Sequence, residues 1–122
     1  MRIDKNTLRA VLWAQLALLR TRRRLRRGGI EGVVVHPPRP ALPASAGPGV
    51  YALLRRRPHT CLERALVLQA WESAQGNSRD VVIGVDPRGT EFTAHAWLVG
   101  ESDGENARFW ELMRLPAPKP EA

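Results

Sequence analysis

Residues 58–63 read Pro-His-Thr-Cys-Leu-Glu, and they decide the fold because they predict where the central helix begins. Thr60 is at the N-cap, and Glu63, three residues later, completes a capping box. Cys61, the only cysteine of the chain, is therefore expected in the first helical turn. Unpaired N–H groups and the positive end of the helix dipole favour a thiolate at that position. The pattern predicts a nucleophilic cysteine.

Residues 92–98 read Phe-Thr-Ala-His-Ala-Trp-Leu and alternate as a β-strand does. The histidine of this strand, His95, is the candidate base for Cys61. A cysteine at a helix start followed by a histidine on a strand is the plan of a Cys-His hydrolase or acyl transferase. The plainer interpretations are an unreactive buried thiol and a hydrogen-bonded core histidine.

The length of 122 residues predicts one domain, so any site must use a single core. One cysteine excludes an internal disulfide framework and a zinc site built from several cysteines, and it fits a reducing compartment such as the cytoplasm. The spacing of Cys61 and the three histidines matches no common zinc motif, and we expect no metal or cofactor. No apolar run approaches the roughly 18 residues of a spanning helix, and no signal peptide is predicted, so a soluble protein is expected.

The chain divides into four parts. Residues 1–27 predict an amphipathic basic helix, residues 28–57 a proline-rich connector, residues 58–116 the core and residues 117–122 a tail. Apolar residues at helical spacing are expected to pack the first helix on the domain: Leu8, Val11, Leu12, Leu16 and Leu19.

Within the core, the pattern predicts a helix over residues 61–74 and strands over residues 81–85, 91–99 and 107–112. Tight turns are expected between the strands, over residues 86–89 and 100–106. The predicted fold is α+β, with one helix packed on an antiparallel β-meander and an additional N-terminal helix.

Three segments in this order resemble a known family: Cys-Leu-Glu-Arg-Ala-Leu-Val-Leu at 61–68, Ile-Gly-Val at 83–85 and Phe-Thr-Ala-His-Ala-Trp at 92–97. They are similar to the leader peptidases of lasso peptide biosynthesis, which are transglutaminase-like, papain-related cysteine proteases. The resemblance implies a transglutaminase-like (papain-like) core with Cys61 as nucleophile and His95 as base and later acid. It also implies a reaction, in which an acyl-enzyme forms at Cys61 and water releases the leader of a ribosomally made precursor peptide.

The family implies partners as well. These are the precursor peptide, a separate leader-recognition protein and an ATP-dependent cyclase that consumes the freed N-terminus. In the family a third, acidic residue usually orients the imidazole from the strand after the histidine. Val99 stands where the family usually has an acid, two places after the tryptophan.

Hairpin register gives the candidates for this third residue. A turn centred near residue 103 places Glu111 across the hairpin at about the level of His95, so Glu111 is the first candidate. Asp103 and Glu105 are expected at the tip of the turn and are the alternatives, because a bulge or a one-residue slip reverses the faces of a strand.

A formal net charge of +7 predicts an acidic partner, and six arginines lie between residues 20 and 27. That run contains no aromatic residue to stack on bases, which argues against nucleic acid. We expect this arginine cluster to dock the recognition protein or an acidic leader. The alternative functions are an amidase or transglutaminase-type acyl transferase, which differs only in the acyl acceptor, and a non-catalytic basic binding protein.

Overall fold

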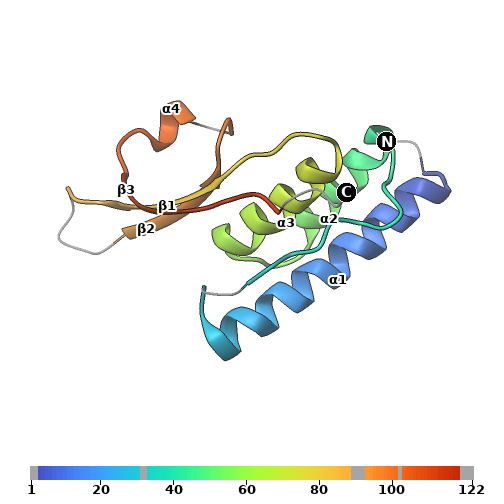
Figure 1. Cartoon of the computed structure of the whole chain (residues 1–122), viewed down its shortest axis with the longest axis horizontal. Coiled ribbons are helices and arrows are strands. Elements are labelled where there is room, and N and C mark those ends of the chain that lie inside the picture. Colours follow the sequence, from blue (N-terminus) through green and yellow to red (C-terminus); the bar gives the residue numbers. More distant parts are fainter. Residues whose placement is uncertain (1–2, 31–32, 89–92, 102, 119–122) are drawn as a thin grey trace.

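The structure is a computed structural model, and it describes residues 3–30, 33–88, 93–101 and 103–118. A group of helices packs against one face of a three-stranded antiparallel sheet (Figure 1). The helices of this group are α1 (Lys5–Gly28), α2 (Gly47–Arg56) and α3 (Cys61–Ala74), with one turn of 3-10 helix at Ala44–Ala46. The short α4 (Asp103–Asn106) lies apart from them (Figure 1). The strands are β1 (Val81–Asp86), β2 (Thr93–Leu98) and β3 (Trp110–Leu115). The α+β class and the N-terminal helix are therefore confirmed.

Helix α1 begins where Asp4 accepts a hydrogen bond from the Thr7 amide (2.8 Å) and ends at Gly29, whose φ of 70° suits glycine. Of the residues predicted to pack on the domain, Val11 is partly buried against the core, but the prediction is wrong for the four leucines. The buried residues lie on the side of the helix opposite to these leucines, and most of them are small: Thr7, Ala10, Ala14, Ala17, Leu18 and Thr21. Leu8, Leu12, Leu16 and Leu19 are exposed.

Small side chains explain this choice of face, because they let helices approach closely. A Cβ atom added to Gly49 of α2 would lie 2.9 Å from Cγ2 of Thr7. Gly49 therefore lets α2 approach α1 closely at Thr7 and Val11, and a leucine at this contact would hold the two helices apart.

Helix α3 lies between α1 and the sheet and is buried on most sides, with its central residues, Ala65–Trp71, all buried. The predicted bounds of this helix are confirmed. After Ala74 the chain turns at Gly76, whose φ of 86° ends the helix as expected.

The strand order is β2-β1-β3, so β1 is the central strand and β2 and β3 are both edges. The predicted hairpin between the second and third strands is wrong, because each pairs with β1 instead. Buried residues on both faces suit β1 to the centre: Val81, Val82 and Gly84.

The chain between β2 and β3 includes α4 and crosses to the other edge of the sheet (Figure 1). The third strand starts at Trp110 rather than Ala107 because α4 and the turn after it precede it. Phe92, part of the predicted second strand, lies outside the described residues.

Candidate active site

Cys61 is the first residue of α3, and its side chain is exposed. The helix start has the predicted capping box. The Thr60 hydroxyl accepts from the Glu63 amide (3.1 Å), and the Glu63 carboxylate accepts from the Thr60 amide (2.9 Å). Cys61 is thus held on a fixed backbone at a helix N-terminus, where its thiol is exposed to solvent.

Glu63 has a second role that the sequence pattern did not reveal. Its side chain is buried, and its carboxylate accepts hydrogen bonds from Arg22 of α1 at 3.3 and 3.4 Å. The same guanidinium donates to the carbonyl of Pro58 at 2.5 Å. Arg22 therefore ties α1 to the segment that presents Cys61, although the sequence grouped it with the docking arginines.

These contacts set the charge of Glu63. Burial alone raises the pKa of this carboxyl, but the hydrogen bonds from the Thr60 amide and the Arg22 guanidinium outweigh burial and hold the pKa below its ordinary value. The carboxylate is therefore ionised at neutral pH and keeps its bond to Arg22.

His95 lies on β2, where it pairs with Gly84 of β1. Its ring contacts Trp97, with centroids 5.8 Å apart, and Phe109, with centroids 5.3 Å apart. Burial lowers the pKa of His95 below its ordinary value, and the positive charge of Arg108 lowers it further. The imidazole is consequently neutral at pH 7, which is the form that a general base needs.

The His95 ring lines an open cavity of about 470 Å³. The other lining residues are Thr93, Ala94, Glu105, Asn106, Arg108 and Phe109. Asn106 is buried, and within the part of the chain that the structure describes its Nδ2 has no hydrogen-bond partner. A neutral imidazole and the Glu105 carboxylate line one cavity, and they suit the polar groups of a peptide. No sequence signal pointed to Asn106.

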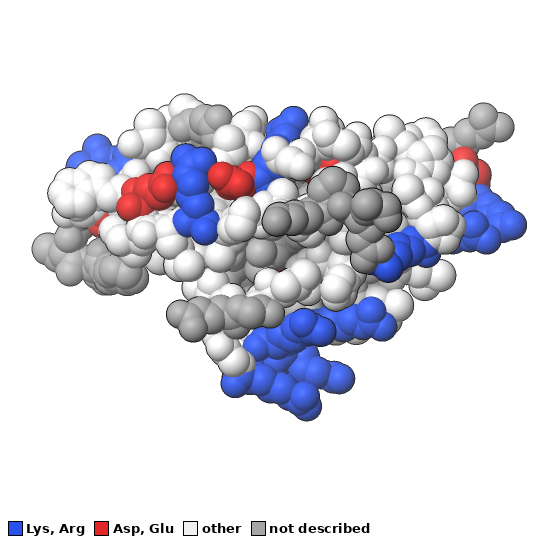
Figure 2. All heavy atoms as spheres, viewed as in Figure 1, with Lys and Arg blue, Asp and Glu red and all other residues white. Residues whose placement is uncertain are grey.

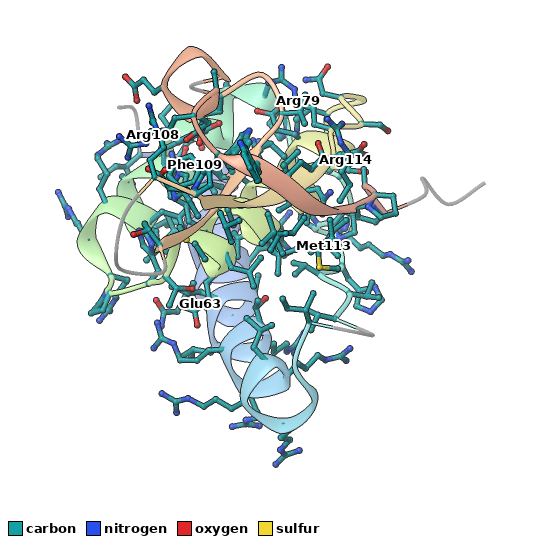
Figure 3. All side chains as sticks on the ribbon, turned by 90° about the vertical axis from the view of Figure 1, so that its left-hand side faces the viewer. Glu63, Arg79, Arg108, Phe109, Met113 and Arg114 are labelled. Carbon is teal, nitrogen blue, oxygen red and sulfur yellow. The ribbon has the colours of Figure 1, made fainter. Side chains whose placement is uncertain are left out.

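The structure does not bring Cys61 and His95 together. Ala96 and Leu98 of β2 are buried in the core with α3, so the alternation of a strand places His95 on the opposite face of the sheet. Figure 3 shows Phe109, the ring partner of His95, on one side of the sheet and Glu63 of α3 on the other. Cys61 does not line the His95 cavity. Pairing of the two residues therefore requires a rearrangement.

Of the two candidates for the third residue whose side chains the structure describes, Glu105 lies at the His95 cavity and Glu111 does not. Glu111 pairs with Gly84 from the side opposite to His95, so the two residues share a level of the sheet but lie two strands, about 10 Å, apart. The Glu111 carboxylate accepts hydrogen bonds from Arg114 at 3.0 Å. Glu105 lines the His95 cavity. Asp103 begins α4, and its side chain lies outside the described part of the structure.

No group of three or more His, Cys, Asp or Glu side chains among the described residues is arranged to hold a metal ion. No helix among them combines the length and the hydropathy that crossing a membrane requires.

Comparison with known proteins gives one match. The family model of the transglutaminase-like superfamily matches residues 8–109, whereas no curated protein and no solved structure matches the chain. The matched span includes most of α1 and all of α3, with Cys61 and His95, and it ends before β3. Asp103 and Glu105 therefore lie inside it and Glu111 outside. The superfamily includes cysteine proteases and acyltransferases and usually has a Cys-His-Asp catalytic triad. With most of its length covered by this match, the chain belongs to the transglutaminase-like superfamily.

Proposed function

We propose that this protein is a cysteine endopeptidase that removes the leader from a lasso precursor peptide, with Cys61 as the nucleophile. The observation that carries the proposal is the exposed Cys61 at a capped helix N-terminus in a transglutaminase-like chain. The order of the three sequence segments supports the finer assignment to leader peptidases.

The reaction needs two steps. The neutral His95 imidazole first takes the proton of the Cys61 thiol, which gives a thiolate and an imidazolium. The thiolate attacks the scissile carbonyl carbon, a carbon–sulfur bond forms, and the carbon–nitrogen bond breaks as the leaving amine takes that proton back from the imidazolium. His95 then removes a proton from water, the resulting hydroxide attacks the thioester, and the leader leaves as a carboxylate while the thiolate returns. An amine in place of water gives a transglutaminase product.

His95 must reach Cys61 for both steps, so the proposal includes a movement of β2. This strand is an edge strand, and Thr93 and Ala94 at its start are exposed. A one-residue change of register moves every side chain of a strand to the other face. The described arrangement is then a resting arrangement, and the precursor or a recognition protein would favour the catalytic one.

The expected partners are a precursor peptide, a separate leader-recognition protein and an ATP-dependent cyclase. The expected location is the cytoplasm, where a free thiol stays reduced.

The test is cleavage of a purified precursor in the presence of its recognition protein, followed by mass spectrometry. Cys61→Ala should abolish cleavage, and the melting temperature should stay near that of the parent because Thr60 and Glu63 still cap the helix. Cleavage at the parent rate by this variant would exclude the proposed mechanism.

A further inference from the structure

Helix α1 presents an apolar face to solvent, which we call the leucine stripe: Leu8, Leu12, Leu16 and Leu19. Their exposed fractions are 56, 64, 49 and 47%. Spacings of four, four and three residues align the four side chains along one side of the helix. A narrow line of leucines at this spacing is typical of the contact between two helices.

The core does not account for this stripe. The face of α1 that packs on α2 and α3 consists mainly of Ala10, Ala14, Ala17 and Thr21, and the leucines lie on the other side. Exposed large apolar side chains in a continuous line mark interaction sites more often than chance positions do.

A groove lies next to the leucine stripe and gives this surface a recess. Its volume is about 190 Å³, and Trp13, Leu16 and Val34 are among its lining residues. The Trp13 indole donates to the carbonyl of His36 at 3.0 Å and holds the opposite wall in place. Val34 is itself 47% exposed. A side chain of a bound helix has a recess to enter at this point.

The charges around the stripe select the partner. The sequence of α1 contains one lysine and seven arginines and no acidic residue. Figure 2 shows basic side chains gathered over the end of α1 that Figure 1 places at residues 20–27. Arg20 and Arg24 line the groove itself. Pairing of two copies of this helix would bring like charges together, whereas carboxylates beside the apolar face of a partner complement them.

We propose that the leucine stripe and its groove bind an amphipathic helix of another protein, in which leucine-sized residues at helical spacing are flanked by Asp and Glu. The stripe binds the apolar face, and the arginines at the end of α1 contact the carboxylates. This inference rests on the surface of α1 and of the segment beside it that carries Val34, and it does not depend on peptidase activity.

Fluorescence anisotropy with labelled synthetic peptides tests the proposal. The probe is a helical peptide with leucines at positions i, i+4, i+8 and i+11 and glutamates on both flanks, and the comparison peptide has lysines in place of the glutamates. We expect at least about tenfold weaker binding of the lysine peptide, and weaker binding of the glutamate peptide at 0.5 M salt than at 0.05 M.

The double variant Leu12→Gln, Leu16→Gln should bind the glutamate peptide at least about tenfold more weakly, since both side chains are central to the stripe. Leu112→Gln is the matched control, because Leu112 is 62% exposed on β3, away from α1, and its binding should stay within about twofold of the parent. Circular dichroism checks that each variant is folded.

Other occupants give different results. Equal weakening by Leu112→Gln, or equal binding of both peptides, would overturn the proposal. It would also be overturned by stripe-dependent flotation with phosphatidylserine vesicles without peptide binding, which indicates a membrane surface, or by a dimer in sedimentation that the double variant loses.

Discussion

Replacement of Arg22 by glutamine tests whether α1 positions the helix that carries Cys61. The parent guanidinium donates to the Glu63 carboxylate and to the Pro58 carbonyl, on both sides of the capping box. Glutamine is shorter and uncharged, so Glu63 remains buried with the Thr60 amide as its remaining partner among these contacts. A buried carboxylate that loses its counter-charge destabilises the folded state.

The size of the effect follows from the geometry. A hydrogen bond to a charged group contributes about 1.5–3 kcal/mol. The distances to Glu63, 3.3 and 3.4 Å, are long, and the Arg22 side chain is 30% exposed, so the low end of this range applies. We expect Arg22→Gln to lower the free energy of unfolding by about 1.5 kcal/mol, which corresponds to a melting temperature lower by about 5–8 °C for a chain of this length.

Thermal denaturation followed by circular dichroism measures this change, with Arg23→Gln as the matched control. Arg23 is exposed on the same helix, and its replacement should change the free energy of unfolding by less than about 0.5 kcal/mol. Equal melting temperatures of the two variants would refute the anchoring role of Arg22.

The pH dependence gives an independent check. The folded-state pKa of Glu63 is lowered, so the stability from its carboxylate is fully present above the unfolded pKa of about 4.3 and is lost as the pH falls through the folded value. The difference in the free energy of unfolding between the parent and Arg22→Gln should therefore become smaller below about pH 4. A difference that is constant from pH 7 to pH 3 would show that the ion pair does not cause it.

Three further changes test the sheet and the site. Gly84→Ala should lower the free energy of unfolding by about 1–3 kcal/mol, because the added Cβ would lie 3.0 Å from the Trp110 carbonyl oxygen. Urea denaturation measures this change, and an unchanged free energy would contradict the close approach of Trp110 to Gly84 of β1. His95→Ala should slow precursor cleavage by about 10²–10⁴-fold yet leave iodoacetamide alkylation of Cys61 in the free protein unchanged, since the two residues lie on opposite faces of the sheet. Slower alkylation of free His95→Ala would show that the imidazole already reaches the thiol. Glu105→Gln should reduce cleavage more than Glu111→Gln does, because Glu105 lines the His95 cavity and Glu111 binds Arg114; the reverse order would restore Glu111 as the orienting acid.

Local signals in the sequence predicted local structure well. The start of α3 depends on side chains within three residues of one another, so Thr60 and Glu63 were sufficient to locate it. The strand that carries His95 was found from alternation alone.

Tertiary packing determines the buried face of α1, the strand order and the face on which His95 lies, and local sequence patterns did not predict these features. Leucine spacing predicted the wrong buried face of α1, because the face with small side chains packs closely on α2, where Gly49 lies against Thr7 and Val11. Adjacent strands in sequence suggested a hairpin, but β1, buried on both faces, occupies the centre of the sheet. The face on which His95 lies follows from that arrangement, and no local pattern contains it.

The acyl-enzyme is the species that tests the peptidase proposal most directly. Precursor, recognition protein and this protein would be mixed, quenched in acid within seconds and examined by intact-protein and peptide mass spectrometry. The proposal predicts that the mass of the leader acyl group is added to the protein, is located on the peptide containing Cys61, and is removed by hydroxylamine, as a thioester is. Leader release without any adduct on Cys61, and at the same rate in Cys61→Ala, would contradict it.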